Sequence, residues 1–321
     1  MNISVIGCGR WGTFITWYLS NHGHQVVLWG RTGSEKFNSL KQTRKNEYVS
    51  INENVLLTDD LSNAVKHAQI IIISISSQSL REFMSTLSNY NIKDKIILLC
   101  MKGVECDSGK RLTEVVLDYG VDKNKVAVWV GPGHIQDFVS GYPNCMVIDS
   151  YSQELTKMLA DSFRTELIRF YYGNDVIGSE IGAAAKNVMG IAAGMLDGGG
   201  FSTLKGPLMA RGAYEVAKLI KAMGGDPLSA YGLCHLGDYE TTLFSEHSHN
   251  RKFGECYVKN LPFTKLAEGV STCKSLKLLG EKFNVDMPIT NAVYSILYDK
   301  AEPMEVLLGL FSRSTRIEFN L

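Results

Sequence analysis

A glycine-rich loop near the start of the chain constrains the fold more than any other feature of the sequence. The GxGxxG pattern of Gly7–Gly12 directly follows the apolar run Ile3–Ile6 and opens a helical pattern over Arg10–Asn21. A second apolar run, Gln25–Trp29, comes next. In such a strand–loop–helix–strand unit, the glycines let the backbone approach a pyrophosphate, which the helix N-terminus then binds. The loop therefore predicts a dinucleotide site at the edge of a parallel sheet.

Strands continue to alternate with helices through the first half of the chain, which is typical of a doubly wound, mainly parallel sheet. The clearest strand, Ala68–Ile75, is apolar throughout, as expected of a parallel strand that is buried on both faces. The other expected strands are Val55–Leu57, Ile96–Leu99, Val126–Val130, Cys145–Ile148 and Ile168–Tyr172.

Helical periodicity replaces the alternation after Asp175 and continues to the end of the chain. We therefore expect an α/β plus all-α protein with two domains. Residues 1–174 would form an NAD(P)-binding Rossmann domain, and residues 175–321 a helical substrate and catalytic domain. The expected helices are Ile177–Asp197, Leu204–Met223, Thr272–Phe283, Ile289–Tyr298 and Met304–Phe311.

Composition excludes several classes of protein. Lys+Arg and Asp+Glu both number 33, and this zero formal net charge argues against a bulk electrostatic nucleic-acid binder. The 7 cysteines form no CxxC pair, so reduced thiols in a cytoplasmic protein are expected. No apolar run reaches the roughly 18 residues of a membrane span. The HxH pair of His247 and His249, near Cys256, is weak as a metal signal, and we expect no metal site.

The stretch Ile177–Asp197 contains a lysine in an unusual setting. Glycines recur within it at multiples of four residues, so they fall near one stripe of the helix, and Lys186 lies on the same stripe. Because each glycine costs roughly 1 kcal/mol of helix stability relative to alanine, another backbone or a ligand is expected to approach closely there. A tightly packed core helix with an outward-reaching lysine is the alternative. The glycines are Gly178, Gly182, Gly190 and Gly194.

Cofactor choice depends on the end of the second expected strand. NAD-selective sites usually place an acidic residue there to bind the ribose 2′-hydroxyl, but this strand ends in Gly30 and Arg31. A guanidinium is suited to the 2′-phosphate of NADP. We therefore expect NADP to be accepted, with NAD as the alternative and use of both cofactors open.

Several motifs along nearly the whole chain are similar to those of one family. The sequence resembles the NAD(P)-dependent glycerol-3-phosphate dehydrogenases of the bacterial type. The motifs that carry the resemblance are Gly7–Thr13, Lys102-Gly103, Gly131–His134, Ala185-Lys186-Asn187, Asp197-Gly198, Arg211-Gly212, Gly237-Asp238, Asn250–Gly254, Glu268-Gly269-Val270 and Met287-Pro288-Ile289.

The resemblance implies residue roles. Lys186 matches the family's proton acceptor, with Lys102 and Asp238 as further catalytic residues. The implied substrate-binding residues are Lys102, Gly131, Gly133, Asp238, Ser248, His249, Asn250 and Arg251. The implied cofactor-binding residues are Gly7, Gly9, Arg10, Trp11, Gly12, Arg31, Lys102, Ile135, His249 and Glu268. The family also suggests a homodimer that supplies glycerol phosphate for phospholipid synthesis.

The chemistry of a secondary alcohol agrees with these roles, because its oxidation requires a base for the hydroxyl proton. Lysine, with a pKa near 10.4, is a poor base at neutral pH. Burial and a second cation, for which Lys102 is the candidate, would lower that pKa, and Asp238 could accept a hydrogen bond from Lys186.

The chain departs from the family's pattern around substrate recognition. His249 stands where an arginine is usual, Gly133 stands where a serine is usual, and the segment Ser202–Lys205 has no asparagine. The proline expected in the loop after Tyr48 is also absent. The leading expectation is interconversion of dihydroxyacetone phosphate and sn-glycerol 3-phosphate. The alternatives are the same hydride chemistry on a related phosphorylated or carboxylated hydroxy compound, and a non-catalytic NAD(P)-binding protein.

Overall fold

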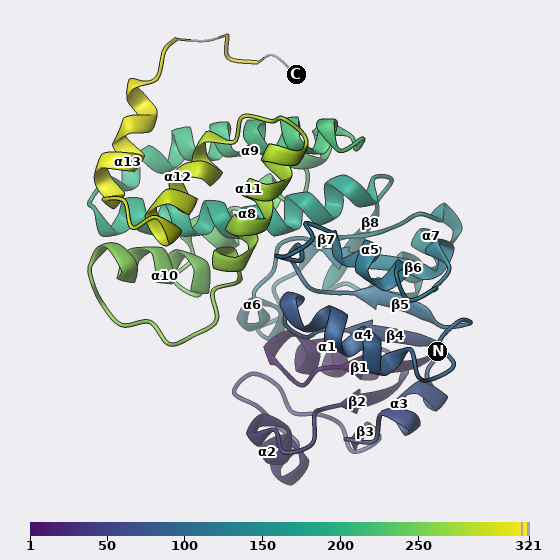
Figure 1. Cartoon of the computed structure of the whole chain (residues 1–321). Coiled ribbons are helices and arrows are strands. Elements are labelled where there is room, and N and C mark those ends of the chain that lie inside the picture. Colours follow the sequence, from purple (N-terminus) through teal and green to yellow (C-terminus); the bar gives the residue numbers. More distant parts are fainter. Residues whose placement is uncertain (316, 320–321) are drawn as a thin grey trace. The chain divides into compact units, whose positions relative to one another are not determined.

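The computed structural model describes residues 1–315 and 317–319 (Figure 1). The chain divides into two compact units. The first comprises Met1–Met101 and Leu112–Val176, and the second comprises Lys102–Arg111 and Ile177–Leu321. The short segment Lys102–Arg111 thus leaves the first unit and belongs to the helical second unit.

In the described residues, the first unit contains one 8-stranded sheet in the order β3-β2-β1-β4-β5-β6-β7-β8. Neighbouring strands are parallel except for β6 and β7, which are antiparallel. Chain order reverses between β1 and β4, the point where doubly wound sheets bind ligands beyond the carboxyl ends of their strands. The strands are β1 Asn2–Ile6, β2 Gln25–Trp29, β3 Leu56–Thr58, β4 Ile70–Ile73, β5 Ile96–Leu99, β6 Val126–Val130, β7 Asn144–Ser150 and β8 Ile168–Tyr172.

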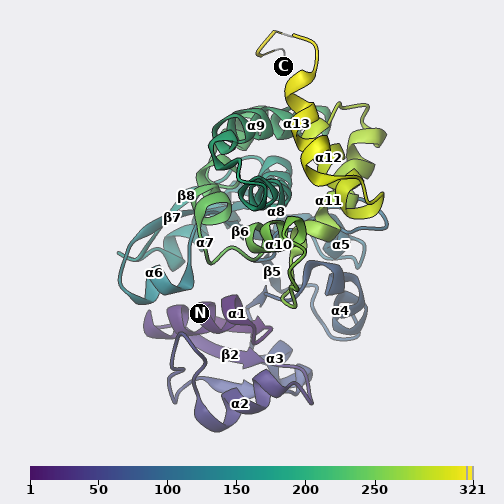
Figure 2. The ribbon, with the colours of Figure 1, turned by 90° about the vertical axis from the view of Figure 1, so that its left-hand side faces the viewer.

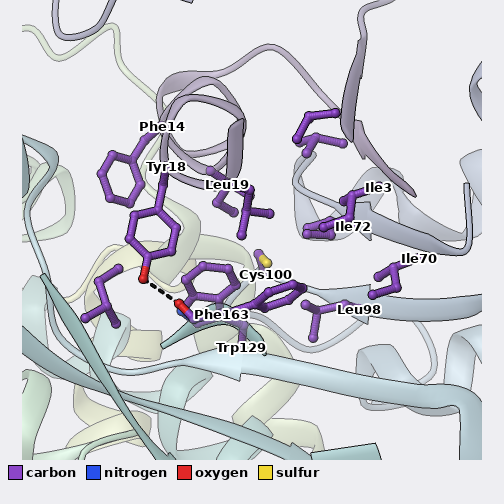
Figure 3. Packing of buried hydrophobic residues seen from close by; sticks show 14 of the residues in the cluster. Ile3, Phe14, Tyr18, Leu19, Ile70, Ile72, Leu98, Cys100, Trp129 and Phe163 are labelled. Carbon is purple, nitrogen blue, oxygen red and sulfur yellow. Dashed lines mark hydrogen bonds between the residues drawn. The ribbon is translucent and has the colours of Figure 1, made fainter. Parts of the chain in front are cut away.

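The core of the first unit forms because these strands alternate with amphipathic helices. Aromatic rings dominate the packing of α1 against the sheet, where Phe14 and Tyr18 lie close to Trp129 and Phe163 (Figure 3). The Tyr18 hydroxyl donates to the Phe163 carbonyl at 2.5 Å, so this buried polar group has a partner. The helices are α1 Arg10–Asn21, α2 Glu35–Thr43, α3 Leu61–His67, α4 Leu80–Leu87, α5 Leu112–Leu117, α6 Ile135–Val139 and α7 Gln153–Phe163.

The second unit is built around α8, Val176–Gly198, which has neighbouring helices on several sides (Figure 2). Every residue from Ile181 to Leu196 is buried, which explains why this helix is rich in alanine and glycine rather than amphipathic. The helices around it are α9 Lys205–Ala222, α10 His249–Val258, α11 Glu268–Lys282, α12 Pro288–Tyr298 and α13 Pro303–Gly309.

The predicted fold class, a mainly parallel doubly wound sheet followed by a helical region, is confirmed. The strand expected over Ala68–Ile75 is shorter, because β4 pairs only from Ile70 to Ile73. Within the described residues, no helix is long and apolar enough to cross a membrane.

Candidate active site

Lys186 lies in the middle of α8 and points into the second unit rather than outward. Its exposed fraction is only 7%. The ammonium Nζ is 2.6 Å from Asp238 Oδ2 and donates a hydrogen bond of 2.8 Å to Thr242 Oγ1. The outward-reaching lysine considered as the alternative is therefore wrong. A buried lysine without such partners would be very costly, and here a buried carboxylate and a hydroxyl satisfy it.

Lys102 binds the same carboxylate oxygen. Its Nζ is 2.6 Å from Asp238 Oδ2. The segment that carries it is fixed to the second unit by hydrogen bonds, since Asn187 Nδ2 donates to the Lys102 carbonyl at 3.1 Å. At the far end of that segment, Arg111 forms a buried ion pair of 2.7 Å with Glu180 of α8. Two ammonium groups therefore share one carboxylate within a single structural unit.

This arrangement changes the acidity of Lys186. Burial lowers the pKa of its ammonium to about 7, the attraction of Asp238 opposes this shift, and the repulsion from Lys102 adds to it. Asp238 is buried as well, but the two ammonium groups outweigh that burial and hold the pKa of the carboxyl below its ordinary value. At neutral pH, Lys186 can therefore both donate and accept a proton.

The glycine stripe of α8 serves close packing of the protein's own chain. A Cβ at Gly194 would overlap with the carbonyl oxygen of Arg251, and one at Gly190 would lie 2.9 Å from Thr242 Cγ2. A Cβ at Gly182 would lie 2.8 Å from the sulfur of Cys234. Of the two expectations for the stripe, close approach of another backbone is confirmed. Clearance for a ligand at these glycines is wrong, because protein atoms fill the space.

In the first unit, the GxGxxG loop has the geometry that its glycines require. Gly7 has a φ of +109°, and a side chain there would collide with the carbonyl of Ser74 at the end of β4. A Cβ at Gly12 would overlap with the Gly7 carbonyl. A Cβ at Gly9 would meet no atom within 4 Å, so the chain leaves open space at the N-terminus of α1. The first backbone N–H groups of that helix have no intrahelical partner, and such a terminus suits a pyrophosphate.

The first turn of α1 carries Arg10 and Trp11. The Arg10 guanidinium lies 5.1 Å from the ring centre of Tyr48, and Trp11 packs on Phe14 with ring centres 5.1 Å apart. Arg31 is exposed just beyond the end of β2. Both guanidinium groups thus belong to the unit that carries the glycine-rich loop.

Two residues that follow Arg31 in the sequence act on Cys8 of the glycine-rich loop. The Ser34 hydroxyl hydrogen-bonds the thiol of Cys8 in the glycine-rich loop, and Lys36 lies close enough to act electrostatically on that thiol. Burial raises the pKa of Cys8, while Ser34 and Lys36 oppose the shift. The run from Arg31 to Lys36 holds two cations, two hydroxyls and one carboxylate.

The predicted residues fall into two groups, each held by one unit. The first unit holds Gly7, Gly9, Arg10, Trp11, Gly12, Arg31, Gly131, Gly133 and Ile135. The second unit holds Lys102, Lys186, Asp238, Ser248, His249, Asn250, Arg251 and Glu268. In the described part of the chain, no three His, Cys, Asp or Glu side chains come together as a metal site.

Comparison with known proteins identifies the family. The model of the NAD-dependent glycerol-3-phosphate dehydrogenase N-terminus matches residues 2–156, and that of the C-terminus matches residues 175–308. The chain belongs to the NAD-dependent glycerol-3-phosphate dehydrogenase family. The glycerol-3-phosphate dehydrogenase [NAD(P)+] of Prosthecochloris aestuarii is 35% identical over 99% of this chain and 100% of its own length. That of a Thermoanaerobacter species is 35% identical over 100% of this chain and 99% of its own length.

A solved structure of a glycerol-3-phosphate dehydrogenase from Coxiella burnetii shares the fold. It superimposes with a TM-score of 0.89 and 24% identity, covering 97% of this chain and 98% of that one. Both halves of this chain therefore match the glycerol-3-phosphate dehydrogenase family in sequence, and the whole chain matches it in fold.

Against that family background, Ser248 and Asn250 are held by hydrogen bonds within the protein. The Ser248 hydroxyl accepts from the Arg251 N–H and caps the start of α10. The Asn250 amide donates to Asn187 Oδ1 at 3.0 Å and accepts from the Gly269 N–H at 2.9 Å. Asn187 follows Lys186 directly in α8, so Asn250 fixes α10 beside the buried lysine.

The side chains of Arg251 and His249 both contact polar groups of the protein itself. Arg251 Nε is 2.6 Å from Asp197 Oδ2, and the buried Lys205 binds the same oxygen at 2.7 Å. His249 Nδ1 lies 3.3 Å from the Leu266 carbonyl. The Asp197 carboxylate thus ties together two segments in which this chain departs from the family's pattern.

At Gly133, where the family usually has a serine, an aromatic ring occupies the space that a side chain would need. Gly133 has a φ of +154°, and a Cβ there would overlap with the ring of Phe138 in α6. At Gly131, with a φ of +126°, a Cβ would lie 3.0 Å from the Met146 Cα. Ile135 begins α6 with its side chain buried in the core, so only its backbone could meet a cofactor.

Thr242 and Glu268 complete the second unit's candidates. Thr242 was not among the predicted residues, although its hydroxyl accepts from Lys186. Its position in a polar run four residues after Asp238 was a usable signal, because one helical turn brings such residues to the same side. Glu268 is partly buried in the first turn of α11, and its carbonyl accepts from the Thr272 hydroxyl at 2.8 Å.

Proposed function

We propose that this protein interconverts dihydroxyacetone phosphate and sn-glycerol 3-phosphate with NAD(P)(H), using Lys186 as the group that exchanges a proton with the substrate. The carrying observation is the buried Lys186 ammonium with a pKa near 7, beside Asp238 and Lys102. Membership in the glycerol-3-phosphate dehydrogenase family supports the substrate and the cofactor class.

The glycine-rich loop fits the cofactor, since Gly9 leaves room at the start of α1 and the helix offers free N–H groups. A bound nicotinamide would supply or accept the hydride. In ketone reduction, the Lys186 ammonium donates its proton to the oxygen that is becoming a hydroxyl. In alcohol oxidation, the neutral amine takes that proton back.

Asp238 and Lys102 would have opposite effects on this exchange. Asp238 stabilises the charged lysine and fixes its direction, while Lys102 destabilises the charge and leaves the amine available as a base. Thr242 accepts one further ammonium hydrogen and thereby restricts the rotation of the head group. The remaining N–H of Lys186 is the one that would meet the substrate oxygen.

The pH dependence of turnover tests the role of Lys186. Alcohol oxidation needs the neutral amine, so its kcat/KM should rise with pH through a midpoint near 7. Ketone reduction needs the ammonium, so its kcat/KM should fall with pH through the same midpoint. The measurement is the initial rate in both directions across about pH 6 to 9. Profiles without a midpoint in that range would exclude this proton exchange.

Arg31 is expected to favour NADPH. Replacing it by alanine should lower kcat/KM for NADPH by about tenfold or more, because a charge-assisted bond to the 2′-phosphate is lost. The value for NADH should change little. The matched control is Arg81→Ala, which removes a partly exposed arginine of the same unit that pairs with Asp118. Equal losses with both cofactors would argue against a 2′-phosphate site.

A related ketone substrate is a second candidate. It is favoured by Gly133, where the Phe138 ring occupies the side-chain space, and by Arg251, which is paired with Asp197. Purified protein with NADPH or NADH should oxidise the cofactor with dihydroxyacetone phosphate if the first proposal holds. Oxidation only with another small keto-phosphate or keto acid would support the second.

We further infer a cytoplasmic homodimer whose product supports phospholipid synthesis. All 7 cysteines are free thiols, which suits a reducing compartment. The lipid role and the dimer rest on the family resemblance. Light scattering of the purified protein measures the assembly state directly.

A further inference from the structure

A second buried polar pair, His235 and Tyr239, lies on either side of Asp238 in the sequence. Both side chains have an exposed fraction of 0%. The Tyr239 hydroxyl is 2.6 Å from His235 Nε2, and the two rings meet edge to face with centres 4.8 Å apart. Neither ring takes part in the proton exchange proposed above, so their buried polar atoms need another explanation.

Hydrogen bonding determines where the protons of this pair lie. His235 Nδ1 is 2.8 Å from the carbonyl oxygen of Gly182 in α8. A carbonyl can only accept, so Nδ1 carries a proton. Burial lowers the pKa of His235 to about 4, so the ring is neutral and Nε2 accepts from the Tyr239 hydroxyl. The chain of donors therefore runs from Tyr239 through His235 to α8.

His235 and Tyr239 are both connected to the groups that surround the Lys186 ammonium. Gly182 lies one helical turn before Lys186, so His235 is fixed to the part of α8 that carries the ammonium. The Asp238 N–H donates to the His235 carbonyl at 3.0 Å. The Tyr239 carbonyl in turn accepts from the Thr242 N–H at 3.1 Å. Asp238 and Thr242, the two partners of the Lys186 ammonium, are therefore each joined by a backbone hydrogen bond to His235 or to Tyr239.

The glycine at position 182 makes this attachment possible. A Cβ there would lie 3.1 Å from His235 Cβ and 2.8 Å from the sulfur of Cys234. A larger residue would push the turn that carries Asp238 away from α8. Gly182 and His235 therefore both help to set the distance between the Asp238 carboxylate and the Lys186 ammonium.

We propose that His235 and Tyr239 are positioning residues that hold Asp238 and Thr242 against the Lys186 ammonium. This inference rests on the proposed role of Lys186 in proton exchange. It assigns to the pair no contact with substrate or cofactor. Its effect is exerted through the distance from Asp238 Oδ2 to Lys186 Nζ, which is 2.6 Å here.

The charged and titratable groups around the pair set the sign of the expected effect. Lys186 of α8 and Asp238 of the same turn act on His235, and Glu215 of α9 with Tyr231 acts on Tyr239. Lys186 itself faces Asp238 and Lys102. Because the attraction of Asp238 raises the pKa of Lys186, loosening Asp238 should lower it.

The test is the pH profile of Tyr239→Phe, which removes one hydroxyl and keeps the ring. The midpoint of kcat/KM should move to lower pH in both reaction directions, and kcat should fall while KM changes little. His235→Asn, which keeps a donor near the Nδ1 position, should shift the midpoint less than His235→Leu, which keeps none. Tyr239→Phe added to His235→Leu should cause no further shift, because the partner is already absent.

Tyr257→Phe is the matched control, since that hydroxyl donates to the Ile296 carbonyl of α12 at 2.9 Å. It should leave the midpoint in place. Thermal unfolding of each variant checks that it is folded. A folded Tyr239→Phe protein with the wild-type midpoint would overturn the positioning role alone. A wild-type profile without a midpoint near 7 would instead refute the role of Lys186.

Discussion

Replacing Lys186 by alanine is expected to lower kcat by about three orders of magnitude or more, because the substrate oxygen then has no proton donor or acceptor. Binding of NADPH should remain near the wild-type level, since the glycine-rich loop belongs to the other structural unit. Steady-state rates in both directions and a fluorescence titration with NADPH measure the two quantities.

Lys186→Arg separates charge from proton exchange. A guanidinium keeps the positive charge beside Asp238 but has a pKa far above neutrality and does not release its proton. Its turnover should therefore be close to that of Lys186→Ala. Turnover within tenfold of the wild type in either variant would contradict the assignment of Lys186.

Gly194→Ala is expected to destabilise the protein by about 3 kcal/mol, because its Cβ would overlap with a backbone carbonyl that cannot rotate away. That carbonyl belongs to Arg251 of α10. The contact is reciprocal, since a Cβ at Gly254 of α10 would overlap with the carbonyl of Ile191 in α8. The two helices therefore touch backbone to backbone. The free energy of unfolding in urea is the measurement.

Gly206→Ala provides the control for that prediction. Gly206 is in the first turn of α9, and a Cβ there would meet no atom within 4 Å. Alanine should stabilise such a site by up to about 1 kcal/mol. If Gly194→Ala were as stable as the wild type, the close approach of α8 and α10 would be wrong.

Most of the fold could be predicted from the sequence, because the patterns that indicate strands, helices and turns are local. Apolar runs such as that of β4 and the glycines around Gly7 depend on nearby residues, and the strand, although shorter than expected, and the close turn at the glycines are both present. The unusual setting of Lys186 was also visible, because a lysine among glycines and alanines conflicts with a purely structural helix.

Features that depend on long-range contacts were less predictable. Lys102 follows the end of a strand, and this position suggests the edge of the sheet. Its segment nevertheless belongs to the helical unit, because Asn187 donates to the Lys102 carbonyl and Arg111 pairs with Glu180. Both of these partners are more than 60 residues away in the sequence. The glycine stripe predicted a close approach but could not say that α10 makes it. The pairing of Arg251 with Asp197 leaves no trace in sequence spacing.

The separation of residues between the two units has a consequence for how such an enzyme can diverge. Arg31 and the glycine-rich loop belong to the first unit, while Lys102, Lys186 and Asp238 belong to the second. On the proposed roles of these residues, substitutions that exchange one coenzyme for the other need not alter the pKa of Lys186. A related enzyme can change its coenzyme preference and keep its acid–base chemistry, since the residues for the two properties belong to different structural units.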